Sequence, residues 1–226
     1  MTDTANDLRS ALDRYRLTVP EESHIQLCRY CELLWDWNSK INLTRHLDMD
    51  AFVSRDLVDT LKLSAHIESG AKILDVGSGG GVPGIPLAIV RPGLKVSLAE
   101  SVGKKARVLD SIVRRLGIKT TVHARRGEAV LAKEKFDVVT VRAVASLRKL
   151  LFWFQKVPQS FDQMLLIKGP RWVEEQKEAT EEGLMQNVNL TKLASYKSPG
   201  HDGESVVLSL RFPGPNEVEA VSSTEE

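Results

Sequence analysis

The sequence predicts an α/β protein in which a mostly parallel β-sheet follows an N-terminal helical extension. From residue 71 onward, short apolar runs alternate with helical stretches, a pattern typical of parallel strands covered by helices on both faces. The first 70 residues show helical spacing without that alternation. The last two strand-like segments follow each other without a crossover helix, so we expect antiparallel pairing at the end of the sheet.

Three helices are expected in residues 1–70. Apolar side chains recur at helical spacing from Leu8 to Tyr15, and a second stripe follows Pro20, where two acidic residues favour the positive end of a helix dipole. The third helix is expected to begin near Phe52 and to stop before the glycine at position 70. These helices make up the expected extension.

Seven strands and four helices are expected in the rest of the chain. The strands are expected at residues 72–76, 95–99, 120–123, 136–141, 164–168, 190–195 and 205–212, and the helices at 84–90, 103–116, 146–155 and 172–182. Residues 71–212 therefore form the expected sheet domain. Residues 213–226 contain four acidic side chains and no basic one, and we expect them to be a disordered tail.

Composition predicts a cytoplasmic globular protein. The 226 residues are 42% hydrophobic and 27% charged, which excludes a disordered or membrane-embedded chain. No apolar run approaches the roughly 20 residues that a transmembrane helix needs, and the first 20 residues are too polar for a signal peptide. We therefore expect no membrane partner.

The net charge of +1 conceals a basic centre. Residues 76–172 hold 18 basic and 6 acidic side chains, a net charge of +12, between two acidic segments. The densest run, residues 104–126, has eight basic side chains and Asp110 as its only acid. Such a run suits a polyanion such as RNA, but a solvated helix surface has the same composition.

The sharpest local signal is the string ILDVGSGGGVPGIPLAIV at residues 73–90. A strand ends near Asp75, and Gly77, Gly79 and Gly81 leave backbone without Cβ atoms where a ligand can approach the carboxyl edge of a sheet. The next strand ends at Glu100, about 20 residues further on, where a carboxylate can accept hydrogen bonds from ribose hydroxyls. The spacing predicts a nucleoside-containing cofactor, and the alternative is a tight turn without a ligand.

Two cofactors compete for this loop. Gly79, Gly81 and Gly84 also match the G-x-G-x-x-G pattern of NAD-binding proteins. However, Asp75 would repel a pyrophosphate but suits the ammonium and sulfonium groups of S-adenosylmethionine. Pro83 also offers no N–H group to a diphosphate at the start of the helix. The residues therefore favour S-adenosylmethionine.

The glycine loop and six other strings closely resemble one family, the bacterial ribosomal RNA small subunit methyltransferase G family (GidB), over about residues 20–210. The strings are WNSKINLT (37–44), RDLVDTL (55–61), DVGSGGGVPGIPLAIVRP (75–92), ESVGKKARVL (100–109), RRGE (125–128), FDVVTVRAVASL (136–147) and LIKG (166–169). The resemblance implies a class I, Rossmann-like methyltransferase fold with a seven-stranded sheet and S-adenosylmethionine as cofactor. The implied reaction is methylation of N7 of guanine 527, in the 530 loop of 16S rRNA in the small ribosomal subunit.

The resemblance also implies roles for individual residues at the ends of the predicted strands. The residues expected at the cofactor are Asp75, Gly77, Gly79 and Gly81 at the methionine half, Glu100 at the ribose, Arg126, Gly127 and Glu128 by the adenine, and Ser78, Pro83 and Ser101 with no part of the cofactor assigned. The residues expected to bind the substrate are Lys104, Lys105, Arg107 and Lys168. Arg142, after the fourth sheet strand, is expected both at the cofactor and at the reacting base.

Arg142 is the single catalytic candidate. Guanine N7 has a free lone pair, so its methylation needs positioning and desolvation rather than removal of a proton. We expect Arg142 to position the guanine or its phosphate through paired donors rather than to act as an acid or base. The alternative is a structural ion pair with an acid such as Asp137 or Glu100.

Three positions depart from the family pattern. Asp56 stands where the family usually has His, Gly127 where it usually has Ala, and Ser205 where it often has a basic residue. The last departure removes an expected RNA contact.

Cys28 and Cys31 form a single C-x-x-C pair inside a helical stripe. We expect buried thiols rather than metal ligands, no bound metal, and a monomer. Two other functions stay open at this point, namely a non-catalytic module that binds S-adenosylmethionine or RNA, and an NAD-dependent oxidoreductase.

Overall fold

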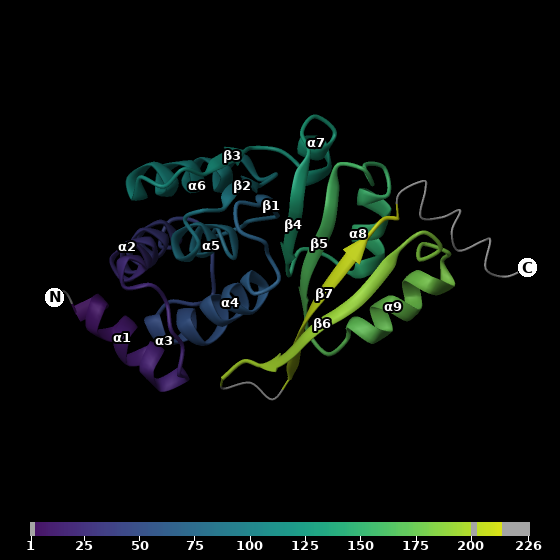
Figure 1. The fold of residues 1–226 in the computed structure, drawn as a ribbon. Coiled ribbons are helices and arrows are strands. Elements are labelled where there is room, and N and C mark those ends of the chain that lie inside the picture. Colours follow the sequence, from purple (N-terminus) through teal and green to yellow (C-terminus); the bar gives the residue numbers. More distant parts are fainter. Residues whose placement is uncertain (1–2, 200–202, 214–226) are drawn as a thin grey trace, which may run out of the picture.

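The computed structural model of the chain describes residues 3–199 and 203–213, and its centre is a seven-stranded sheet (Figure 1). The strands are β1 (Lys72–Val76), β2 (Lys95–Ala99), β3 (Thr121–His123), β4 (Phe136–Arg142), β5 (Phe161–Lys168), β6 (Asn189–Lys197) and β7 (Glu204–Arg211). Their order in the sheet is β3-β2-β1-β4-β5-β7-β6. Strands β1 to β5 are parallel, whereas β7 is antiparallel to both β5 and β6. The predicted sheet and its antiparallel closing hairpin are confirmed.

The helices follow the predicted order, with additions. They are α1 (Asp3–Tyr15), α2 (Glu21–Asn38), α3 (Met49–Ala51), the π-helix η1 (Phe52–Leu57), α4 (Val58–Ser64), α5 (Gly84–Val90), α6 (Gly103–Leu116), α7 (Gly127–Leu131), α8 (Leu147–Phe154) and α9 (Trp172–Glu181). The expected third helix is three consecutive segments, which begin earlier than predicted because the Asp48 carboxylate caps α3 by accepting the Ala51 N–H at 2.7 Å. The expected tail lies outside the described residues, apart from Pro213.

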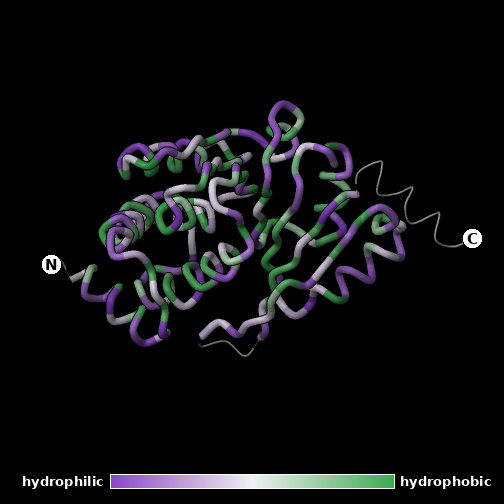
Figure 2. Tube along the Cα trace, viewed as in Figure 1, coloured by the Kyte–Doolittle hydropathy of each residue, from purple (hydrophilic) through white to green (hydrophobic). Residues whose placement is uncertain are grey.

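Helices cover both faces of the sheet (Figure 1), because successive strand residues point to opposite sides. Ile73 belongs to an apolar cluster that includes residues of α1, α2, α4, α5 and α6, whereas its neighbour Leu74 belongs to a second cluster with α7, α8 and α9. Figure 2 shows hydrophilic and hydrophobic residues alternating along α6, as expected of a helix that packs one side inward. The helices of residues 1–70 thus share their apolar core with the sheet.

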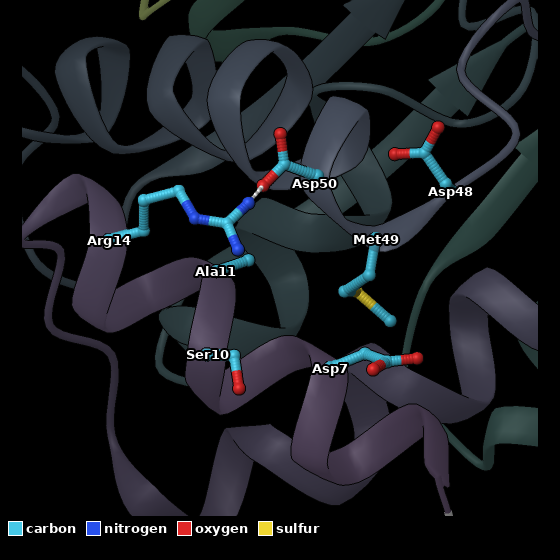
Figure 3. A pocket seen from close by; sticks show the side chains of 7 residues that line it. All are labelled: Asp7, Ser10, Ala11, Arg14, Asp48, Met49 and Asp50. Atoms are coloured by element: carbon cyan, nitrogen blue, oxygen red, sulfur yellow. Dashed lines mark hydrogen bonds and ion pairs between the residues drawn. The ribbon is translucent and has the colours of Figure 1, made fainter.

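Helix α1 is anchored beside the segment that precedes η1. Arg14 pairs with Asp50 of α3 (Figure 3), and the other carboxylate oxygen of Asp50 accepts the Tyr15 hydroxyl at 2.5 Å. A small cavity of about 230 Å³ lies at this contact, with Asp7 and Met49 in its lining. Among the described residues, no helix combines the length and hydrophobicity that a membrane crossing requires.

Candidate active site

The glycine loop connects β1 to α5 through three residues in left-handed conformations. Gly77, Gly79 and Gly81 have φ values of +69°, +55° and +101°, which favour glycine. The Tyr30 hydroxyl of α2 supports the loop by donating to the carbonyl of Gly80 at 2.9 Å. A Cβ atom on Gly79 would meet nothing closer than a backbone oxygen at 3.8 Å, so the space above this residue is open to a ligand.

Asp75 lies beneath the loop and is only 1% exposed. Its Oδ1 accepts the Thr140 hydroxyl at 3.0 Å, and its Oδ2 accepts the N–H of Gly84 at 3.3 Å. Burial raises the pKa of Asp75 to about 6, and these hydrogen bonds limit the rise. Asp75 therefore joins β1, β4 and the start of α5, and its contact with the methionine half of the cofactor stays a prediction.

Other predicted cofactor residues also shape the loop from below. Ser78, Gly81 and Pro83 are buried, and a Cβ atom on Gly81 would lie 2.6 Å from the Ile85 side chain. In the G-x-G-x-x-G pattern, Gly84 allows α5 to approach the sheet, because a Cβ atom there would lie 2.3 Å from a side-chain carbon of β2. Close packing thus accounts for these positions.

Glu100 combines a structural role with the geometry that a ribose requires. Its Oε2 accepts the N–H of Gly79 at 2.9 Å and its Oε1 accepts the N–H of Val102 at 2.7 Å, with the residue 5% exposed. Each carboxylate oxygen has a second lone pair, which can accept a ribose hydroxyl. The open backbone at Gly79 beside this carboxylate fits S-adenosylmethionine.

Ser101 and the predicted adenine neighbours lie after β2 and β3, at the same edge of the sheet. Ser101 and Arg126 are exposed, Glu128 is half-buried and Gly127 is buried. A Cβ atom on Gly127 would lie 2.6 Å from Cγ2 of Val76. Glycine at position 127 therefore leaves room for the Val76 side chain.

A cavity of about 600 Å³ opens beside the loop, at the carboxyl ends of β4 and β5. Its lining consists of Arg45, His46, Arg55, Asp59, Arg142, Ala143, Val144, Ala145, Ile167, Lys168, Gly169, Glu175 and Ser205. The cavity borders the glycine loop at Val144, since a Cβ atom on Gly77 would lie 2.5 Å from Cγ2 of that residue. Its volume is in the range of small-molecule sites.

Two carboxylates of the helical extension hold Arg142 at the wall of this cavity. Its Nη2 donates to Oδ1 of Asp56 at 2.7 Å, and its Nη1 donates to Oδ2 of Asp59 at 3.0 Å. The Asp56 side chain is 1% exposed and that of Arg142 is 19% exposed. Burial alone would lower the pKa of Arg142, but the two carboxylates outweigh burial and raise it, so Arg142 stays charged.

The ion-pair partners of Arg142 differ from those that the sequence suggested. Neither Asp137 nor Glu100 contacts it. The Asp137 carboxylate accepts the backbone N–H of Lys72 at 2.7 Å, and the Glu100 carboxylate accepts the N–H of Gly79 in the glycine loop. Both partners belong to the helical extension, far from Arg142 in sequence, so the local pattern around Arg142 does not reveal them.

The same network extends to a histidine and a tyrosine. Nδ1 of His46 lies 2.9 Å from Oδ1 of Asp56, and the Tyr196 hydroxyl of β6 donates to Oδ1 of Asp59 at 2.6 Å. Burial alone would raise the pKa of Asp56, but His46 and Arg142 together lower it. Burial, followed by the charge of Asp59, raises the pKa of Tyr196, which keeps its proton as a donor.

Lys168, a predicted substrate residue, lines the cavity and contacts other residues of its lining. Its Nζ donates to the carbonyl of Ala145 at 2.6 Å and to Oε2 of Glu175 at 2.7 Å. The same Glu175 oxygen accepts the N–H of Leu147 at 2.7 Å. Lys168 and Glu175 therefore fix the segment that follows Arg142.

The other predicted substrate residues lie outside this lining. Lys104, Lys105 and Arg107 occupy the first turns of α6, and Lys104 and Arg107 are exposed. None of the three forms an ion pair with a described residue. The structure therefore separates the α6 cluster from the Arg142 cavity.

Several cavity residues were missed from sequence. The strings WNSKINLT and RDLVDTL carried the family resemblance without any assigned role, and they flank or contain Arg45, His46, Arg55 and Asp59. That unassigned resemblance was the available signal. Tyr196 and Glu175 gave no comparable signal.

The sheet order, the glycine loop after β1 and the carboxylate after β2 define a class I, Rossmann-like methyltransferase. A model of one family, described as rRNA small subunit methyltransferase G (GidB), matches residues 23–202, and the chain belongs to this family. It is therefore an S-adenosylmethionine-dependent methyltransferase of small-subunit ribosomal RNA.

Relatives with the same name span most of the chain. A ribosomal RNA small subunit methyltransferase G from Rhodopirellula baltica is 45% identical over 190 residues, covering 84% of this chain and 82% of the relative. Its counterpart from Psychromonas ingrahamii is 32% identical over 206 residues, covering 91% and 97%.

Solved structures confirm the fold. A mutant of MtNAS in complex with S-adenosylmethionine has a TM-score of 0.56 at 18% identity, covering 92% of this chain and 84% of that one. The tRNA methyltransferase TrmK of B. subtilis has a TM-score of 0.51 at 13% identity, covering 67% and 64%.

The C-x-x-C pair is buried in α2, as predicted. Cys28 and Cys31 are free thiols, and burial raises the pKa of Cys28 to about 11. Within the described ranges, no group of three or more His, Cys, Asp and Glu side chains is arranged to hold a metal ion.

Proposed function

We propose that the chain methylates N7 of guanine 527, in the 530 loop of 16S rRNA, in the cytoplasm. S-adenosylmethionine supplies an electrophilic methyl group when bound. The observation that carries the proposal is the position of Arg142, which two carboxylates hold at a cavity that borders the glycine loop at Val144. The target base would enter this cavity and meet the cofactor at that border.

The cavity chemistry suits a nitrogen that already has a lone pair. Asp59 accepts a hydrogen bond on each carboxylate oxygen, and Glu175 accepts two on one oxygen, so these acids hold their neighbours in place. Arg142 has five N–H donors, and its two contacts with Asp56 and Asp59 leave others for guanine O6 or a phosphate. Positioning, rather than proton removal, is the role that this arrangement supports.

The direct test is transfer of tritiated methyl from S-adenosylmethionine into undermethylated 30S subunits, with the modified base mapped. We expect label at N7 of guanine 527. Label at another atom would refute the proposed target. Cofactor binding without transfer, to either 30S subunits or free 16S rRNA, would favour the non-catalytic module.

Replacement of Arg142 by lysine tests its role, because lysine keeps the charge but loses the planar set of donors. We expect Arg142→Lys to lower kcat by about 100-fold, equivalent to about 3 kcal/mol, while affinity for S-adenosylmethionine persists. Arg148→Lys is the control, since Arg148 pairs with Glu182 at the surface. Full activity in Arg142→Lys would contradict the positioning role.

The α6 cluster has a separate test. If Lys104 and Lys105 bind rRNA phosphates, neutralising both should reduce the slope of log affinity against log salt by about 1.4 to 1.8. An unchanged slope would identify them as solvated side chains. The monomeric state and the lack of a bound metal stay predictions.

A further inference from the structure

The charge around the Arg142 cavity is not balanced. Four basic side chains line it, whereas two acidic side chains do so. Arg142 pairs with Asp59 and with Asp56, which is not part of the lining, and Lys168 pairs with Glu175. With Asp56 counted, the four basic and three acidic side chains carry a net charge of +1, and the basic lining residues outside these pairs are Arg45 and Arg55.

Within the described ranges, neither of these arginines has an acidic partner. Among the described residues, Arg45 and Arg55 form no ion pair and no side-chain hydrogen bond, although Arg55 is partly buried. A partly buried guanidinium has lost some of its water without receiving an acceptor in exchange. An anion bound in the cavity would supply that acceptor.

Hydrogen bonds hold the backbone in place on both sides of Arg45. Asn38 Oδ1 accepts the N–H of Thr44 at 2.9 Å, on the side that precedes Arg45. On the other side, the N–H of His46 donates to Thr44 Oγ1 at 3.0 Å, and Trp35 Nε1 donates to the His46 carbonyl at 2.8 Å. Asn38 and Thr44 of the WNSKINLT string therefore position the backbone of Arg45, the residue that follows the string.

Arg55 is held by the π-helix η1. Its neighbours Ser54, Asp56 and Leu57 are buried, and the Asp56 side chain binds Arg142. Single-turn π-helices are frequent at functional sites, where the wider turn redirects side chains. In this chain the turn lets Asp56 reach Arg142 while Arg55 lines the cavity.

We propose that Arg45 and Arg55 bind the phosphate groups of the RNA strand on either side of the nucleotide that enters the Arg142 cavity. This inference rests on the proposed function. A planar guanidinium group can donate two hydrogen bonds to one phosphate, and two such groups at one cavity suit a strand that passes across it. The helical extension thus supplies a phosphate-binding wall, which this chain needs all the more because Ser205 contributes no charge to the same lining.

The test uses Arg45→Ala, Arg55→Ala and the double variant, with Arg29→Ala as the matched control. Arg29 is an exposed arginine of α2 that lines no part of the cavity and has no ion-pair partner among the residues described. Affinity for undermethylated 30S subunits is measured across salt concentrations, together with kcat, KM and affinity for S-adenosylmethionine. Thermal midpoints confirm that each variant is folded.

Each single substitution should reduce the salt slope by about 0.7 to 0.9, and the double substitution by about twice that. KM for 30S subunits should rise at least tenfold in the double variant, with affinity for S-adenosylmethionine unchanged. The variants Arg45→Lys and Arg55→Lys should keep the slope, because they keep the charge. If the double variant shows the same slope and KM as Arg29→Ala, the inference is wrong.

Different results would overturn the proposed function and the phosphate-binding role. If the unmodified protein transfers no methyl to guanine 527, the proposed function fails. If it does transfer methyl and the double variant is indistinguishable from Arg29→Ala, only the phosphate-binding role fails. Loss of affinity for S-adenosylmethionine in the double variant would also overturn that role, since it would show that the arginines support the cofactor site.

Discussion

The contact between Gly127 and Val76 predicts that Gly127→Ala changes the free energy of unfolding in opposite directions, depending on whether residue 76 is valine or alanine. In Gly127→Ala, the new Cβ atom would lie 2.6 Å and 2.8 Å from the two Cγ atoms of Val76. Non-bonded carbons prefer about 3.5 to 4.0 Å. Relieving such an overlap in a packed core costs about 1 to 3 kcal/mol. Alanine also favours the helix by about 0.5 to 1 kcal/mol over glycine at this first residue of α7. The net expectation is a fall of up to about 2.5 kcal/mol in the free energy of unfolding.

The same substitution should stabilise a protein that carries Val76→Ala. That background removes both Cγ atoms and leaves the Val76 Cβ atom at 3.3 Å, a tight contact that a small shift relieves. The helix preference of alanine then dominates, and we expect Gly127→Ala to raise the free energy of unfolding by up to about 1 kcal/mol. The coupling between the two sites should be about 1 to 3 kcal/mol.

Urea unfolding of the four proteins in this cycle measures the coupling, with midpoints compared at equal m-values. Thermal unfolding gives a second readout, where 1 kcal/mol corresponds to about 2 to 4 °C for a chain of this size. If Gly127→Ala has the same effect with Val76 and with alanine at position 76, the packing argument is refuted. Titration with S-adenosylmethionine in the same variants shows whether the predicted adenine neighbour also affects cofactor binding.

Three further substitutions test the site. The pKa of Asp75 is about 6 in the folded protein and about 3.9 in an unfolded chain, so its contribution to stability is complete below about pH 4 and is lost as the pH rises through 6. In the unmodified protein the free energy of unfolding should therefore fall by up to about 3 kcal/mol more between pH 4 and 6 than it does in Asp75→Asn. Urea unfolding at a series of pH values measures this difference, and the same pH dependence in both proteins would contradict the expectation. In Glu100→Gln, the amide nitrogen cannot accept a hydrogen bond, so the backbone N–H of either Gly79 or Val102 loses its acceptor. We expect the free energy of unfolding to fall by about 1 to 3 kcal/mol. We also expect weaker binding of S-adenosylmethionine, which calorimetry measures. Asp59→Asn removes one charge from the clamp on Arg142, and kcat should fall about 10- to 100-fold while the KM for S-adenosylmethionine is unchanged; a normal kcat would show that one carboxylate suffices.

Elements with strong local signals were predicted from the sequence to the residue. Strands β1 and β2 and helices α5 and α6 have the predicted bounds, because apolar runs there end at glycine or charged residues. Helix α6, for example, ends at Gly117, whose φ of +67° stops a helix. Strand β5 begins three residues earlier than predicted, because Phe161 pairs with Phe136 of the neighbouring strand. That extension depends on a partner that the local pattern does not contain.

The sequence predicts those parts of the candidate site that are local patterns, but not the contacts between residues far apart in the chain. The glycine loop and Glu100 are local patterns at a known spacing, and both occupy the expected edge of the sheet. Arg142 was found from its place after a strand, but Asp56 and Asp59 lie 86 and 83 residues away in sequence. Only the fold brings them together, so the sequence could predict the arginine but not what holds it.

The hydrogen bond between Tyr196 and Asp59 also has a consequence for biosynthesis. The two residues are 137 positions apart, and β6, which contains Tyr196, is followed by one further strand among the described residues. A growing chain therefore contains the glycine loop, Glu100 and Arg142 well before this contact can form. Chains interrupted ahead of β6 would keep the residues predicted to face the cofactor but would lack one support of the Arg142 side chain. Translation through the β6–β7 hairpin therefore determines when the Arg142 cavity is complete.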